Sequence, residues 1–379
     1  MENNTEKLRF TPSICITHDC NLKCSYCYQS QKDTKKMSIE TAKTVVDWIF
    51  DNIPDNTSGV EINFIGGEPL LEFNLIKEIV EYTYSKRRNE KFIFFASTNA
   101  TILTEEMKEW LTDHKDYFIL GLSLDGDRET HNYNRSNSFD AIDIDFFITT
   151  WPEQGVKMTL SEYSLPRLAE NIKFLHSKGI KNIVGVNLEE GYFDWSDEKY
   201  IEILVPQLKE LVEFYVENDA LEVNQMFSKD LYICETKNQR RKWCGVGVGC
   251  PFFDINGKMY PCTFLTPMTF SNDELSELAK IDFTNDENFI DDDCFNNCYI
   301  YNICPTCAGA CYLVNKTFKE KDRRRCRTQK LISLFMADLQ AKRIMKNPKI
   351  YDDEELYHTI EAIKKIRSLY LPEFEEYLV

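Results

Sequence analysis

The chain has 379 residues, enough for one large domain and a smaller one. Its formal net charge of −17 argues against nucleic acid or an anionic membrane as a partner, because both repel an acidic protein. No run of 18 apolar residues predicts a transmembrane helix, and the polar N-terminus is unlike a signal peptide. We therefore expect a cytoplasmic protein, whose 14 cysteines are more typical of metal ligands than of disulfides.

Short apolar runs alternate with amphipathic stretches from residue 9 to about residue 218. The apolar runs predict buried strands at 14–16, 60–65, 92–95, 118–122, 156–160 and 183–186. The stretches between and after them predict helices near 39–49, 74–88, 104–114, 165–178 and 198–218, the first capped by Ser38. Strand–helix units in series predict an α/β fold with a parallel sheet, open or barrel-like.

Three cysteines follow the first predicted strand, in the spacing C-x3-C-x2-C: Cys20, Cys24 and Cys27. A [4Fe–4S] cluster usually takes four cysteine ligands. Three thiolates on one tight loop therefore leave one iron open for a small molecule to chelate, and Tyr26 can cover the cluster. A zinc knuckle is the alternative, although closed zinc sites want four ligands.

Polar or glycine-rich clusters follow the next three predicted strands. They are Gly66-Gly67-Glu68, then Ser97-Thr98-Asn99, then Ser123-Leu124-Asp125. Ligands of parallel α/β folds bind at the carboxyl ends of strands, so these clusters and the cysteine loop predict one shared site. We expect Gly67 to lack a side chain because a ligand contacts its backbone.

The remaining cysteines, Cys15 apart, lie between residues 234 and 326. Asn256-Gly257 between two apolar runs predicts a two-residue hairpin that carries Cys262 back toward Cys244 and Cys250. A denser run follows, Cys294-x3-Cys298-x5-Cys304-x2-Cys307-x3-Cys311, and then Cys326. Two pairs in this run also fit a zinc ribbon. Beyond Cys326, two amphipathic helices are predicted at about 328–346 and 353–370.

The three-cysteine loop and the Gly-Gly-Glu cluster resemble the signature of the radical S-adenosylmethionine (SAM) enzymes. In that family SAM binds the open iron of the cluster and is cleaved to a 5′-deoxyadenosyl radical. The resemblance implies that the Gly-Gly-Glu backbone holds the SAM amino group, and that Ser123 and Arg135 contact its ribose or carboxylate. A surface salt bridge is the alternative role for Arg135. The cofactor-binding residues expected on this basis are Tyr26, Gly66, Gly67, Glu68, Ser97, Asn99, Ser123, Asp125 and Arg135.

The C-terminal cysteines resemble the SPASM extension of radical SAM enzymes, which usually holds two auxiliary [4Fe–4S] clusters. The family run is C-x2-C-x5-C-x3-C, and two spacings here differ from it by one residue, so Cys311 is the alternative to Cys307. On this alignment the first auxiliary set is Cys244, Cys250, Cys262 and Cys307, and the second is Cys294, Cys298, Cys304 and Cys326. Cys15, within an apolar strand, is then plain core.

The resemblance also implies a domain order. A partial (β/α)6 TIM-like barrel would occupy residues 1–228. A small, loop-rich, cysteine-rich iron–sulfur domain would occupy 229–345, and a helical tail 346–379. The cofactors would be three [4Fe–4S] clusters and SAM.

The implied function is a peptide maturase that abstracts hydrogen from a ribosomally made precursor peptide or protein and installs a thioether or carbon–carbon crosslink. A flavodoxin- or ferredoxin-type protein would be the reductant. With 19 residues before Cys20 we expect no leader-binding winged helix. A leader would then be bound by a separate protein, by the C-terminal helices, or not at all.

Three alternatives remain. An anaerobic sulfatase-type maturase would oxidise Cys or Ser to formylglycine, although Thr263 stands where those enzymes carry an Asp base. A non-catalytic iron–sulfur electron carrier explains the cysteines but not the polar clusters after successive strands. A zinc-dependent binding protein explains only the C-terminal cysteines.

Overall fold

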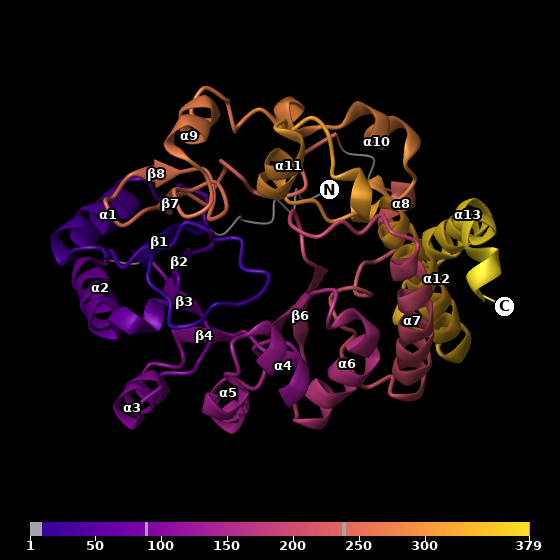
Figure 1. Cartoon of the computed structure of the whole chain (residues 1–379), viewed down its shortest axis with the longest axis horizontal. Helices are drawn as coiled ribbons and strands as arrows, with labels where there is room; N and C mark the ends of the chain where they lie inside the picture. Colours follow the sequence, from indigo (N-terminus) through magenta and orange to yellow (C-terminus); the bar gives the residue numbers. More distant parts are fainter. Residues whose placement is uncertain (1–9, 88–89, 237–239, 379) are drawn as a thin grey trace. The chain divides into compact units, whose positions relative to one another are not determined.

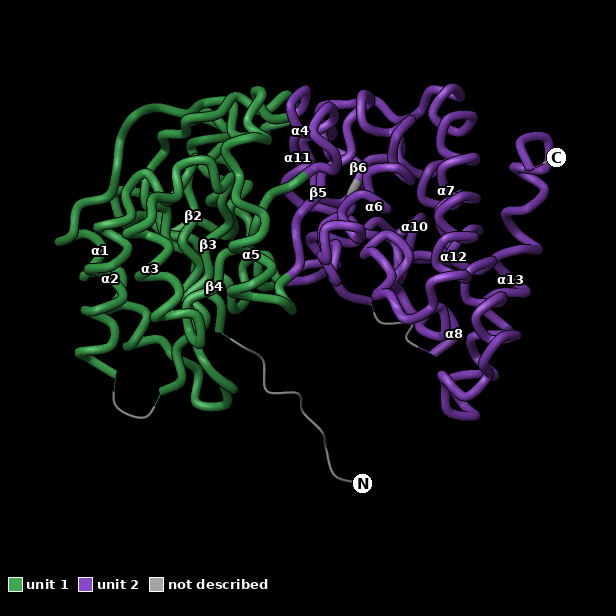
Figure 2. Tube along the Cα trace, turned by 90° about the horizontal axis from the view of Figure 1, so that it is seen from below, with its two compact units in different colours: residues 1–124, 135–154, 245–284 green, residues 125–134, 155–244, 285–379 purple. Residues whose placement is uncertain are grey.

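The computed structural model describes residues 10–87, 90–236 and 240–378. The chain divides into two compact units, each assembled from several stretches of sequence (Figure 2). Unit 1 comprises Met1–Leu124, Arg135–Gln154 and Gly245–Thr284, and unit 2 comprises Asp125–Asn134, Gly155–Cys244 and Asn285–Val379. The cysteine-rich segment 229–345 therefore contributes to both units.

Unit 1 is built on a six-stranded sheet with the order β4-β3-β2-β1-β7-β8. The strands β1 to β4 are parallel to one another; they are β1 (Ser13–Thr17), β2 (Val60–Gly66), β3 (Phe92–Thr98) and β4 (Phe118–Leu122). The ring of Phe64 stacks on Phe94 and Phe118, with ring centres 5.8 and 5.9 Å apart. Aromatic neighbours on one sheet face stabilise strand pairing, so these rings hold β2, β3 and β4 together.

Three helices of unit 1 alternate with the strands as predicted (Figure 1): α1 (Ile39–Asp51), α2 (Phe73–Lys86) and α3 (Glu105–Asp113). Two short helices that were not predicted also belong to unit 1: α5 (Ile144–Thr150) and α9 (Asn272–Leu278). The predicted cap of α1 is confirmed, because the Ser38 side chain accepts a hydrogen bond from the Thr41 amide. Val45, Val46 and Ile49 form part of the buried face of this helix.

The predicted hairpin forms, and it extends the main sheet. Its strands β7 (Phe252–Phe253) and β8 (Met259–Tyr260) are antiparallel, and β7 pairs in parallel with β1. The turn has three residues, 255–257, rather than the predicted two. The Asp254 amide donates a hydrogen bond to the Lys258 carbonyl, and the Gly257 amide donates one to the Asp254 carbonyl. Gly257 has φ +77°, the left-handed position typical of such three-residue loops.

Unit 2 contains the other two predicted strands and most of the C-terminal half. The strands β5 (Val156–Leu160) and β6 (Ile183–Leu188) form a parallel pair. The helices are α4 (Arg128–Asn134), α6 (Leu168–Ser177), α7 (Lys199–Glu217), α8 (Ile233–Thr236), α10 (Asp292–Asn297), α11 (Ala308–Asn315), α12 (Cys326–Lys346) and α13 (Asp353–Leu378). Both predicted C-terminal helices are present as α12 and α13, and α12 packs against α7 and α13.

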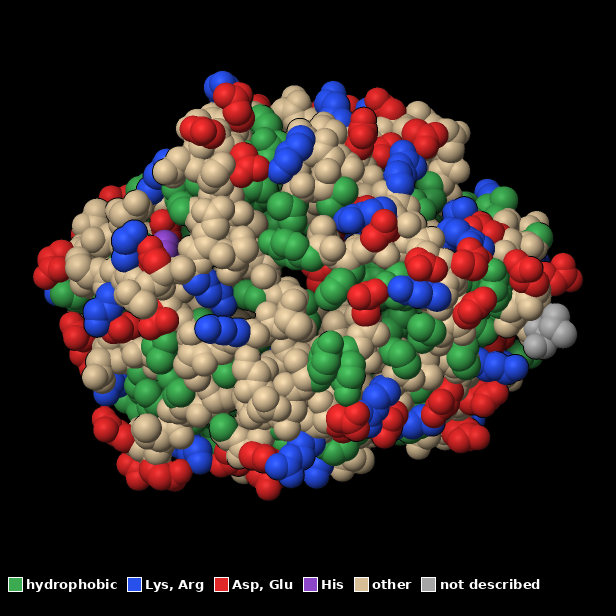
Figure 3. Space-filling model, in the orientation of Figure 1, with side chains coloured by type: hydrophobic (Ala, Val, Ile, Leu, Met, Phe, Trp, Pro, Cys, Tyr) green, Lys and Arg blue, Asp and Glu red, His purple; other side chains and the backbone are tan. Residues whose placement is uncertain are grey.

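The predicted α/β class with parallel strands is confirmed, and all six predicted strands form. Four of them belong to the sheet of unit 1 and two to the pair of unit 2. In the described part of the chain, none of the helices has the length and apolarity needed to cross a membrane. Acidic and basic side chains are interspersed on the face drawn in Figure 3.

Candidate functional site

The cysteine loop begins directly after β1, and its three cysteines are half-buried. Lys32, five positions after Cys27, interacts with all three sulfurs and hydrogen-bonds to Cys27. Burial opposes the charge on Lys32, but Cys27, Cys20 and Cys24 together raise the pKa of its ammonium above the ordinary value. No sequence pattern singles out Lys32. Its ammonium places a positive charge beside the three sulfurs, and cysteine binds metals as the thiolate.

Gly66 and Gly67 bring the end of β2 against the cysteine loop. The Gly67 amide donates to the Thr17 carbonyl at 3.0 Å, and the Glu68 amide donates to the Asp19 carbonyl at 2.8 Å. A Cβ atom on Gly67 would lie 2.2 Å from the Asp19 carbonyl oxygen and 2.8 Å from Cys20 Cβ. The approach of the cysteine loop by itself leaves no room for a side chain at Gly67, and contact of its backbone with a ligand stays a prediction.

The Glu68 carboxylate ties the loop after β2 to the loop after β3. One of its oxygens accepts from the Leu70 amide at 3.1 Å and the Thr98 hydroxyl at 2.8 Å, and the other accepts from the Asn99 amide at 2.8 Å. Burial raises the pKa of Glu68, and these hydrogen bonds oppose the rise by favouring the charged form. The side chain is therefore committed to holding two loops in place.

Asn99 continues this connection to the cysteine loop. Its side-chain amide donates to Asn21 Oδ1 at 2.9 Å, and Asn21 is the residue that follows Cys20. Hydrogen bonds therefore link the loops that follow β1, β2 and β3. The structure brings these predicted clusters together, as expected for the carboxyl ends of neighbouring parallel strands.

Arg135 also belongs to this group. It is buried, with 8% of its surface exposed, and its guanidinium carbon lies 5.4 Å from the centre of the Tyr26 ring. Its charge also lowers the pKa of Glu68, against the effect of burial. Arg135 is therefore not a surface residue, and its role in binding SAM stays a prediction. Arg135 joins the aromatic residue of the cysteine loop to the Glu68 cluster.

Ser97, Ser123 and Asp125, which were also predicted to bind the cofactor, are not part of the hydrogen-bonded connection described above. Ser97 and Ser123 are half-buried, and the Ser123 amide donates to the Thr98 carbonyl at 3.0 Å. Asp125 is fully buried in unit 2, where its carboxylate accepts from the Thr159 amide at 3.1 Å and the Asn134 side chain at 3.3 Å. A role for these three residues in binding SAM stays a prediction.

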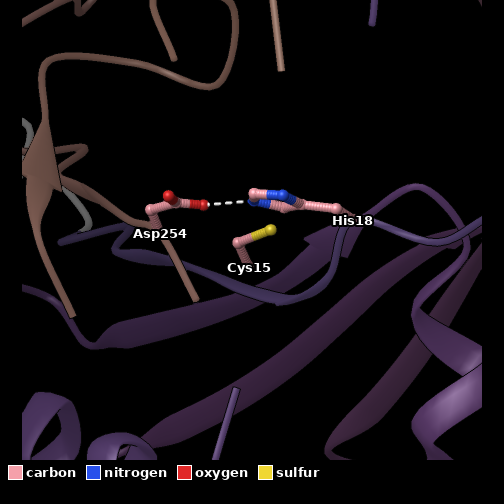
Figure 4. A group of neighbouring side chains, drawn as sticks. All are labelled: Cys15, His18 and Asp254. Atoms are coloured by element: carbon pink, nitrogen blue, oxygen red, sulfur yellow. Dashed lines mark hydrogen bonds and ion pairs between the residues drawn. The ribbon is translucent and has the colours of Figure 1, made fainter. Parts of the chain in front are cut away.

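The buried side chains of Cys15, His18 and Asp254 form a group that the sequence did not reveal (Figure 4). His18 points one ring nitrogen at Asp254 of the hairpin turn, at 2.6 Å, and the other at Asp33, at 3.1 Å. The Cys15 sulfur lies beside them, and one potential ligand atom from each of Cys15, His18 and Asp254 falls within 4.8 Å of the others. Cys15 is fully buried, as expected for a core residue. His18 lies two positions before Cys20, so this group ties the hairpin to the base of the loop.

The segment after Cys262 packs on the cysteine loop within unit 1. The rings of Tyr28 and Phe264 stack with centres 4.6 Å apart, and the Gln31 amide donates to the Met268 carbonyl at 2.9 Å. Cys250 and Cys262 also belong to this unit. A hydrogen bond of 3.1 Å from the Gly247 amide to the Pro261 carbonyl holds their two segments together.

Unit 2 contains a cavity of about 460 Å³ that is lined by the whole second auxiliary set, Cys294, Cys298, Cys304 and Cys326. Burial raises the pKa of Cys294 to about 12 and that of Cys304 to about 11, so both thiols need metal or positive charge to ionise. A sulfur-lined space of this kind fits an iron–sulfur cluster. Cys311 lies in the same wall.

A second cavity of unit 2, of about 310 Å³, is lined by Cys244 and Cys307 together with Trp243 and Met336. Both cysteines belong to the first auxiliary set, and Cys250 and Cys262 of that set lie in unit 1. Glu190, at the end of β6, accepts a hydrogen bond from the Cys307 amide at 3.1 Å. No sequence pattern singles out Glu190.

Comparison with known proteins finds a family similarity in the N-terminal half. Residues 14–190 match the model of the Radical SAM superfamily. An uncharacterized protein of Methanocaldococcus jannaschii is 32% identical over 175 residues, which are 44% of this chain, and the chain spans 59% of that protein's length. A cysteine-type anaerobic sulfatase-maturating enzyme of Clostridium perfringens is 25% identical over 271 residues, covering 65% of this chain and 71% of that enzyme.

Among solved structures, native anSMEcpe with bound AdoMet and the Cp18Cys peptide has a TM-score of 0.65 at 20% identity. That similarity covers 90% of this chain and 99% of that one. At this identity the likeness concerns the fold alone. It extends beyond residues 14–190 and includes the cysteine-rich C-terminal region.

Proposed function

We propose that the protein is a radical SAM enzyme that modifies a peptide or protein, because residues 14–190 match the model of the Radical SAM superfamily. The observation that carries the proposal is the hydrogen-bonded connection of the Cys20–Cys27 loop to Glu68 and Asn99. The family implies a [4Fe–4S] cluster and SAM. When bound, these supply a 5′-deoxyadenosyl radical that abstracts hydrogen from the substrate.

In this proposal Cys20, Cys24 and Cys27 hold the SAM-cleaving cluster. The ammonium group of Lys32 offsets part of the thiolate charge on this loop. Glu68 and Asn99 fix the position of the loop without themselves reacting. Tyr26, Gly66, Gly67, Ser97, Ser123, Asp125 and Arg135 complete the proposed cofactor-binding set. A flavodoxin- or ferredoxin-type protein provides the electron.

The C-terminal cysteines hold two further [4Fe–4S] clusters in this proposal. The sulfur-lined cavity of about 460 Å³ supports the second auxiliary set. The shared cavity of Cys244 and Cys307 supports the first. Such clusters accept an electron from a substrate radical or bind a substrate thiolate, both of which suit oxidative peptide modification.

We propose a crosslink, thioether or carbon–carbon, as the product. Thr263 after Cys262 supports this choice because it offers no carboxylate base for the formylglycine reaction. Formylglycine formation is the second candidate, favoured by the identity to the sulfatase-maturating enzyme over 65% of the chain. Mass spectrometry of a treated cysteine peptide separates the two, because a crosslinked product retains its sulfur and formylglycine made from cysteine does not.

SAM cleavage tests the enzyme class directly. The anaerobically reconstituted protein should form 5′-deoxyadenosine with dithionite, and the Cys20→Ala/Cys24→Ala/Cys27→Ala variant should form none while keeping most of its auxiliary iron. Cys234→Ala is the matched control, because Cys234 lies outside every proposed ligand set, and this variant should cleave SAM normally. Cleavage by the triple variant at the wild-type rate would refute the assignment.

A further inference from the structure

A buried arginine faces the second auxiliary cavity with part of its hydrogen-bonding capacity unused. Arg325 is 5% exposed and lies in the cavity wall directly before Cys326. Its Nη1 atom pairs with Glu190 Oε1 at 2.9 Å, whereas its Nε and Nη2 atoms are buried and have no hydrogen-bond partner. Buried donors without partners are costly, so these two groups call for an acceptor.

The two preceding arginines do not share this property. Arg323 pairs with Asp291 at 2.8 Å, and Arg324 pairs with Asp322 at 2.8 Å and donates to the Gly191 carbonyl at 3.3 Å. Arg324 does not line the cavity. Among these three successive arginines, Arg325 combines a place in the wall of the cavity with unused donors.

Arg325 lines the same cavity as the sulfurs of Cys304 and Cys311. Two other cations of the wall have contacts within the protein: Lys330 pairs with Glu373 at 2.9 Å, and the Lys321 ammonium lies 4.0 Å from the centre of the Tyr301 ring. The acceptor expected for Arg325 is therefore a negatively charged, sulfur-rich group in the space that the cysteines enclose.

We propose that Arg325 donates hydrogen bonds from Nε and Nη2 to the sulfur atoms of the cluster held by Cys294, Cys298, Cys304 and Cys326, and so raises its reduction potential. The inference rests on the proposed function, since that function places a cluster in this cavity. One-electron reduction takes the cluster core from 2+ to 1+ without breaking a bond. With four thiolates, the net charge goes from −2 to −3, so a fixed positive charge and hydrogen bonds to sulfur favour the reduced form.

Glu190 positions Arg325 in this arrangement. It accepts from Arg325 Nη1 and from the Cys307 amide with different oxygens. Its carboxylate thus connects the end of β6 to the arginine and to a proposed ligand of the first auxiliary cluster. The ion pair keeps the guanidinium fork turned so that Nε and Nη2 remain available.

The test is a reductive titration of the full chain with dithionite, followed by electron paramagnetic resonance. A Cys20→Ala/Cys24→Ala/Cys27→Ala background leaves the auxiliary signals alone. Arg325→Gln should lower the reduction equilibrium constant of one auxiliary cluster about tenfold, which is about 59 mV for one electron. Arg325→Lys keeps the positive charge but loses the planar guanidinium donors, so the reduction potential of the cluster should shift less than in Arg325→Gln. The paramagnetic resonance spectrum of Arg325→Lys should also lose the hyperfine couplings from exchangeable protons near the cluster.

Arg324→Gln is the matched control, because it removes the same charge one residue away from the cavity wall, and its potentials should equal those of the parent. If both Arg325 variants keep their iron and their reduction potentials are unchanged, the inference about Arg325 is overturned, whereas the proposed function stands. If Cys298→Ala retains all the iron of the parent protein, no cluster occupies this cavity, and the auxiliary part of the proposed function falls with the inference.

Discussion

Cys307 and Cys311 are the pair of residues that the sequence could not separate. Cys307 is the N-terminal cap residue of α11 and is half-buried, while Cys311 lies within the helix and is 3% exposed. Burial raises the pKa of Cys311 to about 11, but it does the same for the proposed ligand Cys304. The acidity of the thiols therefore does not decide between them.

Cys307 and Cys311 each share a cavity wall with Cys244, and we expect Cys307 to be the ligand because Glu190 fixes its amide. Cys307→Ala should lower the iron content of the reconstituted protein and alter the auxiliary paramagnetic signal. Cys311→Ala should leave both near the wild-type values, since a thiol outside a cluster loses only a small packing contribution. The opposite pattern would show that the family's x3 spacing applies and that the alignment is shifted.

Single residues also show which parts of the site the sequence cannot predict. The cysteine spacing predicts Cys20, Cys24 and Cys27 as ligands because ligand spacing is a local property of one loop. Lys32, His18 and Arg325 carry no such local pattern. Their surroundings come from residues far along the chain, such as Asp254 beside His18 and Glu190 beside Arg325.

At the scale of elements, the loops after β1 and β2 depend on each other through Gly67. Gly67→Ala should lower the free energy of unfolding of unit 1 by about 1–3 kcal/mol, as overpacking does. It should also reduce both the iron held by the Cys20–Cys27 loop and SAM binding, because the added Cβ lies 2.2 Å from the Asp19 carbonyl oxygen. Chemical denaturation, iron analysis and SAM binding measure the three effects.

The control for this substitution is Ser25→Ala, at an exposed position of the same loop. It should change none of the three quantities. If Gly67→Ala lost SAM binding but kept its iron and its stability, contact with a ligand rather than with the cysteine loop would explain the glycine.

The elements themselves were largely predictable. Buried strands and amphipathic helices have periods that the sequence displays, so β1 to β6 and the helices α1, α2, α3 and α6 follow from the hydrophobic pattern. The short helices α4 and α5, of seven residues each, were not predicted, because two turns are too few to display a clear period. Asn256-Gly257 correctly marked a hairpin. Its pairing with β1 was not foreseen, because hydrogen bonds between Ser13–Ile14 and Phe252–Phe253 leave no trace in either local sequence.

At the scale of the whole molecule, iron stoichiometry tests the cofactor content. With three cubane clusters the reconstituted protein should contain about 12 irons per chain and a similar amount of sulfide. A matched sample of the Cys20→Ala/Cys24→Ala/Cys27→Ala variant should hold about 8, because its two auxiliary clusters remain. A wild-type sample with about four irons together with zinc would favour the zinc ribbon for the C-terminal cysteines.

The arrangement of units could not be foreseen from composition. No low-complexity linker or composition change marks the points where the chain passes between units, near residues 124, 135, 154, 245 and 284. Interleaved units of this kind arise from long-range pairing, which sequence periodicity does not report. The three contiguous segments predicted as domains, 1–228, 229–345 and 346–379, follow the order of the sequence motifs along the chain. As domain boundaries they stay a proposal.

The pairing of β7 with β1 has a consequence for synthesis on the ribosome. The first strand is made at residues Ser13–Thr17, and its neighbour on one side, Phe252–Phe253, emerges some 235 residues later. At about 5–20 residues per second, that edge of the nascent sheet waits for about 12–50 s before its partner exists. An unpaired strand edge is a template for association with other chains. The growing polypeptide should therefore need protection until the hairpin has been translated, either by a chaperone or because β1 joins the sheet late.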